Sequence, residues 1–190
     1  MRAHAPWHRH RAFLTSLRAG AFRVAVVTLV MLRASVAFSQ DGTGRWFVPD
    51  VVRGVLLDPT TYAPAIVTWG ATRLDWQSSQ IFFQNGFVEH NPGFTVSGRA
   101  DDTAIGYAAG NRQIFTDALA NLSLSVANNA SARVIERLLQ QRYPSHRKLV
   151  RAIGWIERSA VASYLSYRLS AGHFRQWQSN KQQEVQLGYE

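Results

Sequence analysis

The chain has 190 residues, enough for one domain with a hydrophobic core. Its composition, 46% hydrophobic and 17% charged, excludes a disordered chain, and the absence of cysteine excludes disulfides, thiolate metal sites and a cysteine nucleophile. The net charge of +9 points first to nucleic acid or an anionic membrane. However, six of the 21 basic residues and no acid lie in residues 1–39, which leaves 15 basic against 12 acidic residues, or +3. Without this segment, nucleic acid is not an expected partner.

The N-terminal segment has the order of a secretory signal peptide. An Arg-rich stretch precedes nine apolar or small residues at 24–32, and a small-x-small pattern follows at Ala37-Phe38-Ser39. We predict a signal peptide over 1–39 and a protein exported to the periplasm or the outer face of the inner membrane. An uncleaved anchor, an organelle transit peptide and a start at a later codon stay open, although a membrane span needs about 20 apolar residues.

Glycine and proline break the next stretch, so residues 40–57 are expected to form an extended segment. Asp58-Pro59 is a good helix start, and Pro64 would delay the regular helix by a turn. Spacings of three and four residues predict a helix over about 60–85, with Gly86 as its stop and a loop over 86–101.

Helical spacing returns at Ile105 and continues to Val126, and Asn128-Asn129 is expected to break or bend this helix. A shorter helix then ends before Pro144. Ser145 is expected to cap a last helix, whose apolar stripe runs from Leu149 to Phe174. The prediction is an all-α domain at 58–178, a single bundle of about four helices, followed by a polar, frayed tail at 179–190.

One candidate site combines the end of the first helix with the loop after it. Asp75 and Ser79 share a helix face, and Glu89, His90 and Asn91 follow in the loop. If the loop folds back, Asp75, Glu89 and His90 could converge for acid–base chemistry or metal binding. The structural alternative is that these carboxylates bind backbone amides or an Arg, and that Asn91-Pro92 only starts a turn.

The other histidines of the predicted mature chain give weaker signals. His146 is expected to be solvated, and His173 to be half-buried, although it remains a possible addition to the Asp75 cluster. Zinc-protease, nucleophile-elbow, phosphate-loop and dinucleotide motifs are missing from residues 40–190. We therefore predict no metal and no cofactor.

Basic residues concentrate in the last third of the chain. Residues 133–175 hold nine of them against Glu136 and Glu157. With nearby aromatic residues, a basic face here could meet anionic lipid or an acidic protein partner, and the alternative is a solvated helix face with the aromatics in the core. The candidate residues are Arg133, Arg137, Arg147, Lys148, Arg151, Trp155 and Trp177.

The run Asp75-x3-Ser79 followed by Gly86-x2-Glu89-x-Asn91-Pro92 resembles a pattern found in small bacterial helical membrane proteins of unknown function. The resemblance covers residues 75–92 and implies no known activity. It implies that Asp75, Glu89 and Asn91 belong to one local structure, and it leaves membrane association open. The sequence departs from that pattern because Arg73, Asp75 and neighbouring glutamines make the first helix too polar to span a bilayer alone.

These observations lead to three functional hypotheses. The first, preferred from the sequence, is a non-catalytic envelope domain that binds a protein partner or lipid. The second is a metal-dependent or acid–base hydrolase centred on Asp75, Glu89 and His90, so the sequence leans away from an enzyme without excluding one. The third is an accessory subunit of a membrane complex. The sequence does not define the oligomeric state.

Overall fold

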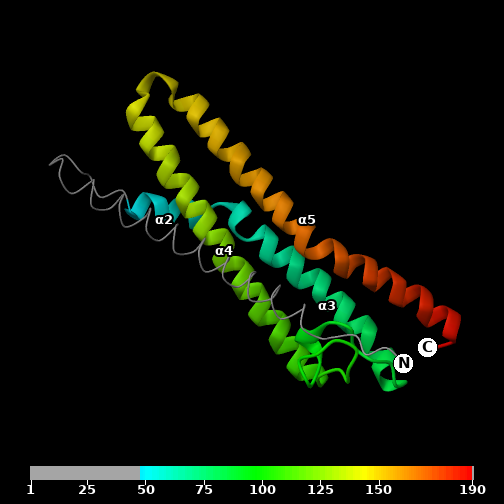
Figure 1. The fold of residues 1–190 in the computed structure, drawn as a ribbon. Coiled ribbons are helices and arrows are strands. Elements are labelled where there is room, and N and C mark those ends of the chain that lie inside the picture. Colours follow the sequence, from blue (N-terminus) through cyan, green and yellow to red (C-terminus); the bar gives the residue numbers. More distant parts are fainter. Residues whose placement is uncertain (1–47, 190) are drawn as a thin grey trace, which may run out of the picture. The chain divides into compact units, whose positions relative to one another are not determined.

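The computed structural model describes residues 48–189, and these residues form an all-α structure of four packed helices (Figure 1). The predicted signal peptide lies outside the described residues. The described residues from Val51 onward form one compact unit. The α-helices are α2 (Val48–Leu56), α3 (Ala63–Gln84), α4 (Tyr107–Arg142) and α5 (Arg147–Leu187), and three single 3₁₀ turns are η2 (Pro59–Thr61), η3 (Pro92–Phe94) and η4 (Pro144–His146).

The three long helices pack against one another, and α4 runs antiparallel to the other two (Figure 1). Near one end, Asn129 of α4 bonds Thr61 of η2, just before α3. Towards the other end, Asp75 of α3 meets His173 of α5. Helices α3 and α5 therefore run in the same direction, with the extended loop 85–106 at the end where α3 finishes.

Residues 48–56 are helical, whereas the sequence predicted an extended segment there. Pro49 stands in the first turn, where its missing N–H costs no helical hydrogen bond, and Gly54 is accommodated inside the helix. Gly54 also has a packing role, because a Cβ there would lie 2.8 Å from the guanidinium of Arg133. Glycine and proline therefore did not mark a break at these positions.

The predicted start of α3 is confirmed. Asp58 caps η2 by accepting a hydrogen bond from the Thr60 amide at 3.1 Å, and the regular helix begins only at Ala63, one turn later, with Pro64 in its first turn. At its other end α3 stops at Gln84, and Gly86 has a positive φ of 84°. Capping and turn chemistry thus defined both ends correctly.

Helix α4 continues through Asn128-Asn129, so the predicted break is wrong. Asn129 is buried, and its side-chain amide donates hydrogen bonds to the hydroxyls of Thr60 and Thr61 at 2.9 and 2.7 Å. Asparagine usually interrupts a helix because its side chain forms hydrogen bonds with nearby backbone groups. The side-chain amide of Asn129 bonds the two threonines instead, so the helix continues. The predicted stop before Pro144 is confirmed, since α4 ends at Arg142.

Helix α5 is longer than the sequence predicted and begins differently. His146 is the N-cap and makes no capping bond through its side chain, so Ser145 is not the cap. The helix continues past Gly172 through most of the predicted tail and ends at Leu187, before Gly188 in the left-handed conformation. Asn180 explains the extension, because its buried amide donates to Ser78 and Ser79 of α3, both at 2.9 Å.

The helices bury small and polar residues against one another and turn many large apolar residues outward. The aromatic core is compact, with Trp76, Phe94 and Ile114 packed together and Ala104 and Ile105 of the loop beside them. The apolar stripe of α5, by contrast, is exposed along its length, so these residues do not form the core. Its exposed members include Leu149, Ile153, Ile156, Tyr164 and Tyr167.

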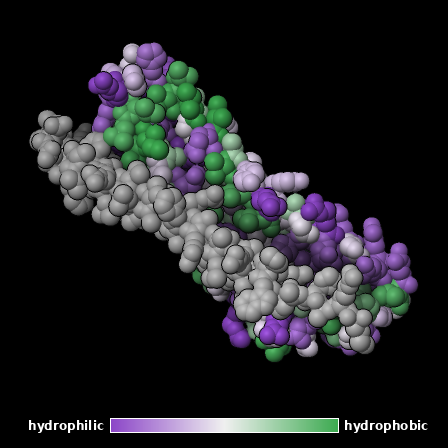
Figure 2. Space-filling model, viewed as in Figure 1, coloured by the Kyte–Doolittle hydropathy of each residue, from purple (hydrophilic) through white to green (hydrophobic). Residues whose placement is uncertain are grey.

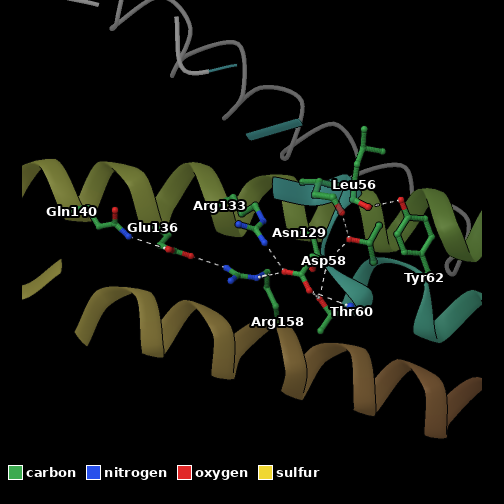
Figure 3. A network of polar contacts seen from close by, with 11 residues as sticks. Leu56, Asp58, Thr60, Tyr62, Asn129, Arg133, Glu136, Gln140 and Arg158 are labelled. Carbon is green, nitrogen blue, oxygen red and sulfur yellow. Dashed lines mark hydrogen bonds and ion pairs between the residues drawn. The ribbon is translucent and has the colours of Figure 1, made fainter. Parts of the chain in front are cut away.

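A buried network of charges joins the start of α3 to α4 and α5 (Figure 3). Asp58 accepts hydrogen bonds from Arg133 at 2.7 Å and from Arg158 at 3.0 Å, and Arg158 also donates to Glu136 at 2.8 Å. The Arg158 side chain is only 4% exposed. Burial by itself would raise the pKa of Asp58, but hydrogen bonds from Thr60 and Arg133, together with the Arg133 charge, lower the pKa below its usual value. The network holds Asp58 ionised.

Candidate functional site

A pocket of about 600 Å³ lies between the end of α3, the second half of α5 and the loop that follows α3. It unites the residues that the sequence singled out: Asp75, Glu89, His90 and Asn91 all line it, and so does His173. This volume is in the range of pockets for small molecules. The loop therefore folds back towards α3, which is the condition on which the sequence-based site hypothesis depended.

Asp75 and His173 form the polar pair of the pocket. Oδ2 of Asp75 lies 2.8 Å from Nδ1 of His173, and the two side chains are 17% and 28% exposed. His173 is half-buried, as expected, and its partner is the Asp75 carboxylate. The Ser79 hydroxyl bonds the Asp75 backbone carbonyl at 2.9 Å, so it belongs to the helix rather than to the pair.

The loop supplies Glu89 and Asn91 through local hydrogen bonds. Oε1 of Glu89 accepts from the Asn91 amide at 2.7 Å, and Oδ1 of Asn91 accepts from the Gly93 amide at 3.1 Å, starting η3. Backbone bridges from Glu89 to Asp102 close the loop on itself. The structural interpretation of the sequence is thus confirmed for these two residues, which also remain part of the pocket wall.

The two remaining sequence-predicted histidines are both exposed. His90 pairs with Asp101 of the same loop, and both side chains are at least 70% exposed. Asp101 has a positive φ of 62°, a backbone conformation that aspartate tolerates better than most residues. His146 is exposed at the start of α5, as predicted, far along the chain from the pocket.

Aromatic rings build the apolar wall of the pocket. Trp76 packs tilted against Phe83 and Phe94, with ring centroids 5.6 and 5.1 Å apart, and Phe82 meets Phe87 edge to face. All five rings line the pocket. They stand beside two carboxylates, and the lining contains neither lysine nor arginine. The wall is therefore aromatic and electron-rich, and its fixed charges are acidic.

The second half of α5 contributes pocket residues that the sequence analysis missed. They are Gln176, Ser179, Asn180 and Gln183, from a stretch predicted in part to be a frayed tail. Their spacing of three and four residues continues the step from His173. The available signal was this polar stripe at helical spacing, which apolar periodicity does not detect.

Asp117 of α4 is a further carboxylate close enough to interact electrostatically with His173. Desolvation by the surrounding protein raises the pKa of Asp117, against a hydrogen bond from Gln113 and the charge of His173. Across residues 48–189, no group of three or more His, Cys, Asp or Glu side chains is placed to hold a metal ion. The described chemistry of the pocket is therefore that of carboxylates, imidazole, amides and aromatic rings.

The predicted basic candidates have diverse surroundings. Arg133 is bonded to Asp58 inside the buried network, and Arg137 and Trp177 are partly buried. The start of α5 exposes the other four, Arg147, Lys148, Arg151 and Trp155.

No helix within residues 48–189 has the length and apolar character needed to cross a membrane. No protein-family model, curated protein or solved structure matches the chain.

Proposed function

We propose that this protein is a non-catalytic binding domain whose pocket takes a small organic cation, such as a quaternary or protonated amine. One observation carries the proposal: two carboxylates and five aromatic rings line a pocket of about 600 Å³ that contains no basic side chain except histidine. Aromatic faces attract cations, and more strongly where water is excluded. Carboxylates beside them favour positive ligands over neutral ones of the same shape.

The hydrogen bonds of the two carboxylates leave capacity for a ligand. Asp75 uses one oxygen for His173, and Glu89 uses one for the Asn91 amide. The second oxygen of each has no hydrogen-bond partner among residues 48–189. The bonds that are made fix both carboxylates in place, so little side-chain entropy is lost when a ligand binds.

Calorimetric titration of the full chain with choline and with its uncharged carbon isostere tests this function. We expect the cation to bind at least about tenfold more tightly, because only it gains from the carboxylates and the ring faces. The double variant Asp75→Asn, Glu89→Gln should remove that preference. Glu157→Gln, an exposed carboxylate on α5 outside the pocket, is the matched control and should bind like the wild type.

The proposal fails if choline and the isostere bind equally. It also fails if choline gives no heat of binding and larger organic cations such as benzyltrimethylammonium and spermidine give none either. It fails too if Glu157→Gln weakens binding as much as the pocket variant. Thermal unfolding of each variant shows whether a loss of binding reflects a loss of fold.

The Asp75–His173 pair favours a second candidate function, acid–base hydrolysis. A carboxylate on Nδ1 orients an imidazole and leaves Nε2 to exchange protons with a substrate or a water. Turnover of a cationic ester such as acetylcholine would support this candidate if His173→Gln abolished turnover while cation binding survived. Binding without turnover supports the non-catalytic function.

A further inference from the structure

The outward face of α5 is a continuous uncharged stripe that no described part of the chain covers. Its residues recur every three or four positions, and they are large and apolar or aromatic at most positions. Five of them are between 56% and 68% exposed, and Phe174 is 36% exposed. The stripe, hereafter the α5 outer stripe, consists of Leu149, Ile153, Ile156, Ala160, Tyr164, Tyr167, Ala171 and Phe174.

The α5 outer stripe cannot be reassigned to the core of the domain. The opposite side of α5 already packs against α3 and α4 through Arg158, Ala162, Ser170 and Asn180, all of them buried. Figure 2 shows hydrophobic side chains gathered over the end where α4 leads into α5, with hydrophilic ones beyond them. Exposed contiguous apolar surface of this kind marks a site of interaction.

Basic residues border the stripe on both sides. At 3.6 residues per turn, Lys148 lies about a quarter of a turn from one edge, and Arg168 and Arg175 lie within about an eighth of a turn of the other. All three are exposed, and Glu157 is the one acid among the exposed residues of α5 from 147 to 175. Arg147 and Arg151, also exposed, add positive charge at the start of α5, and Trp155 is an exposed aromatic residue there.

We infer that the α5 outer stripe docks in the plane of an anionic lipid surface. An apolar and aromatic face with flanking Lys and Arg is what an interfacial helix needs, with its apolar side among the acyl chains and its cations at the headgroups. Tyrosine and tryptophan suit this boundary because each joins an apolar ring to a polar group. A second copy of the same face is a poor partner because the excess positive charges would repel each other. Nucleic acid is a poor partner because it would leave the isoleucines without apolar contacts.

Vesicle flotation of the full chain tests the inference. The probes are vesicles of phosphatidylcholine with phosphatidylglycerol and vesicles of phosphatidylcholine alone, and we expect binding to the anionic vesicles and its loss in high salt. The stripe variant Ile156→Ser, Tyr167→Ser and the charge variant Lys148→Glu, Arg175→Glu should each reduce bound protein by about tenfold or more.

Matched controls separate this face from general stickiness. Phe115→Ser, Leu119→Ser removes two exposed apolar residues from α4, and Arg112→Glu, Arg142→Glu reverses two exposed charges of α4. Both controls should bind like the wild type. Since every variant keeps residues 1–50, any contribution of that segment is the same throughout.

Three results would overturn the inference: equal loss in the control and the stripe variants, unchanged binding in both stripe and charge variants, or a dimer in light scattering that the stripe variant alone dissociates. The last would assign the face to a second copy. Far-UV circular dichroism of each variant checks that the helices are retained.

Discussion

At the scale of single residues, the polar network around Asp58 determines how the three long helices meet. One carboxylate receives Arg133 from α4 and Arg158 from α5, and it also caps the turn before α3. Removing Asp58 would take a carboxylate partner from both Arg133 and Arg158, and the loss of a partner from a buried charge is more destabilising than replacing the whole group. The titration of Asp58 therefore affects the fold.

The lowered pKa of Asp58 predicts how stability depends on pH. A carboxyl group with a lower pKa in the folded state than in the unfolded chain stabilises the fold above the unfolded value, here 3.8. That stabilisation is lost as pH falls through the folded pKa. We therefore expect the stability difference between the wild type and Asp58→Asn, measured by urea unfolding, to be constant above about pH 5 and to shrink below about pH 4.

A difference that stays the same down to pH 2 would show that Asp58 acts by packing rather than by charge. Asp50→Asn, upstream in α2, is not a suitable control because Asp50 makes its own polar interaction. Glu157→Gln on the exposed surface of α5 is suitable, and its stability difference from the wild type should be small at every pH.

At the scale of elements, the distance between α3 and α4 is set by a glycine. A Cβ on Gly110 would lie 2.2 Å from the ring of Trp76, which has 3% of its surface exposed and also lines the pocket. No other residue permits this approach without moving the indole. The close contact of α4 with Trp76 is therefore a requirement of both the core and the pocket.

Two glycine substitutions separate packing from helix propensity. Gly110→Ala should destabilise the protein by about 1–3 kcal/mol, because overpacking against Trp76 exceeds the gain in propensity. Gly172→Ala in α5 meets nothing within 4 Å and should stabilise by about 0.5–1 kcal/mol. Urea unfolding measures both. If the two substitutions had effects of the same sign, the packing at Gly110 would be incorrectly described.

The sequence predicted elements where local chemistry decides and failed where tertiary contacts decide. Asp58, Pro64 and Gly86 bounded α3 correctly because caps and turns depend on adjacent residues. The prediction placed a helix break at Asn129 and a frayed tail at Asn180, and both were wrong. Each asparagine stays in its helix because its side chain bonds a hydroxyl group on another element. Apolar periodicity identified helices correctly, but for α5 it marked the outer face, since the packed face is made of small and polar residues.

The candidate site shows the same division. The short segment from Asp75 to Asn91 predicted one wall of the pocket, because those residues are close in the chain and the loop has to return. The opposite wall comes from α5, about a hundred residues away, and sequence spacing alone could not place it there. His173 was named as a possible member, but its pairing with Asp75 needed the structure.

At the scale of the whole described unit, polar chemistry and charge are distributed unevenly. The pocket end has carboxylates at Asp75, Glu89 and Asp102, whereas the start of α5 is basic, from Arg147 to Arg151. A domain of this kind could present its pocket to a cation while its basic α5 face meets an anionic surface. The two proposals are independent, because the pocket residues and the residues of the α5 outer stripe have no member in common.

NMR of the indole N–H groups and the His173 ring during titration with choline tests whether the pocket binds the cation. Binding in the pocket should shift the signals of Trp76 and His173, which line it, and leave Trp155 of the exposed α5 surface unchanged. Shifts confined to Trp155, or none at saturating choline, spermidine and benzyltrimethylammonium, would contradict the account and remove the pocket as the functional site.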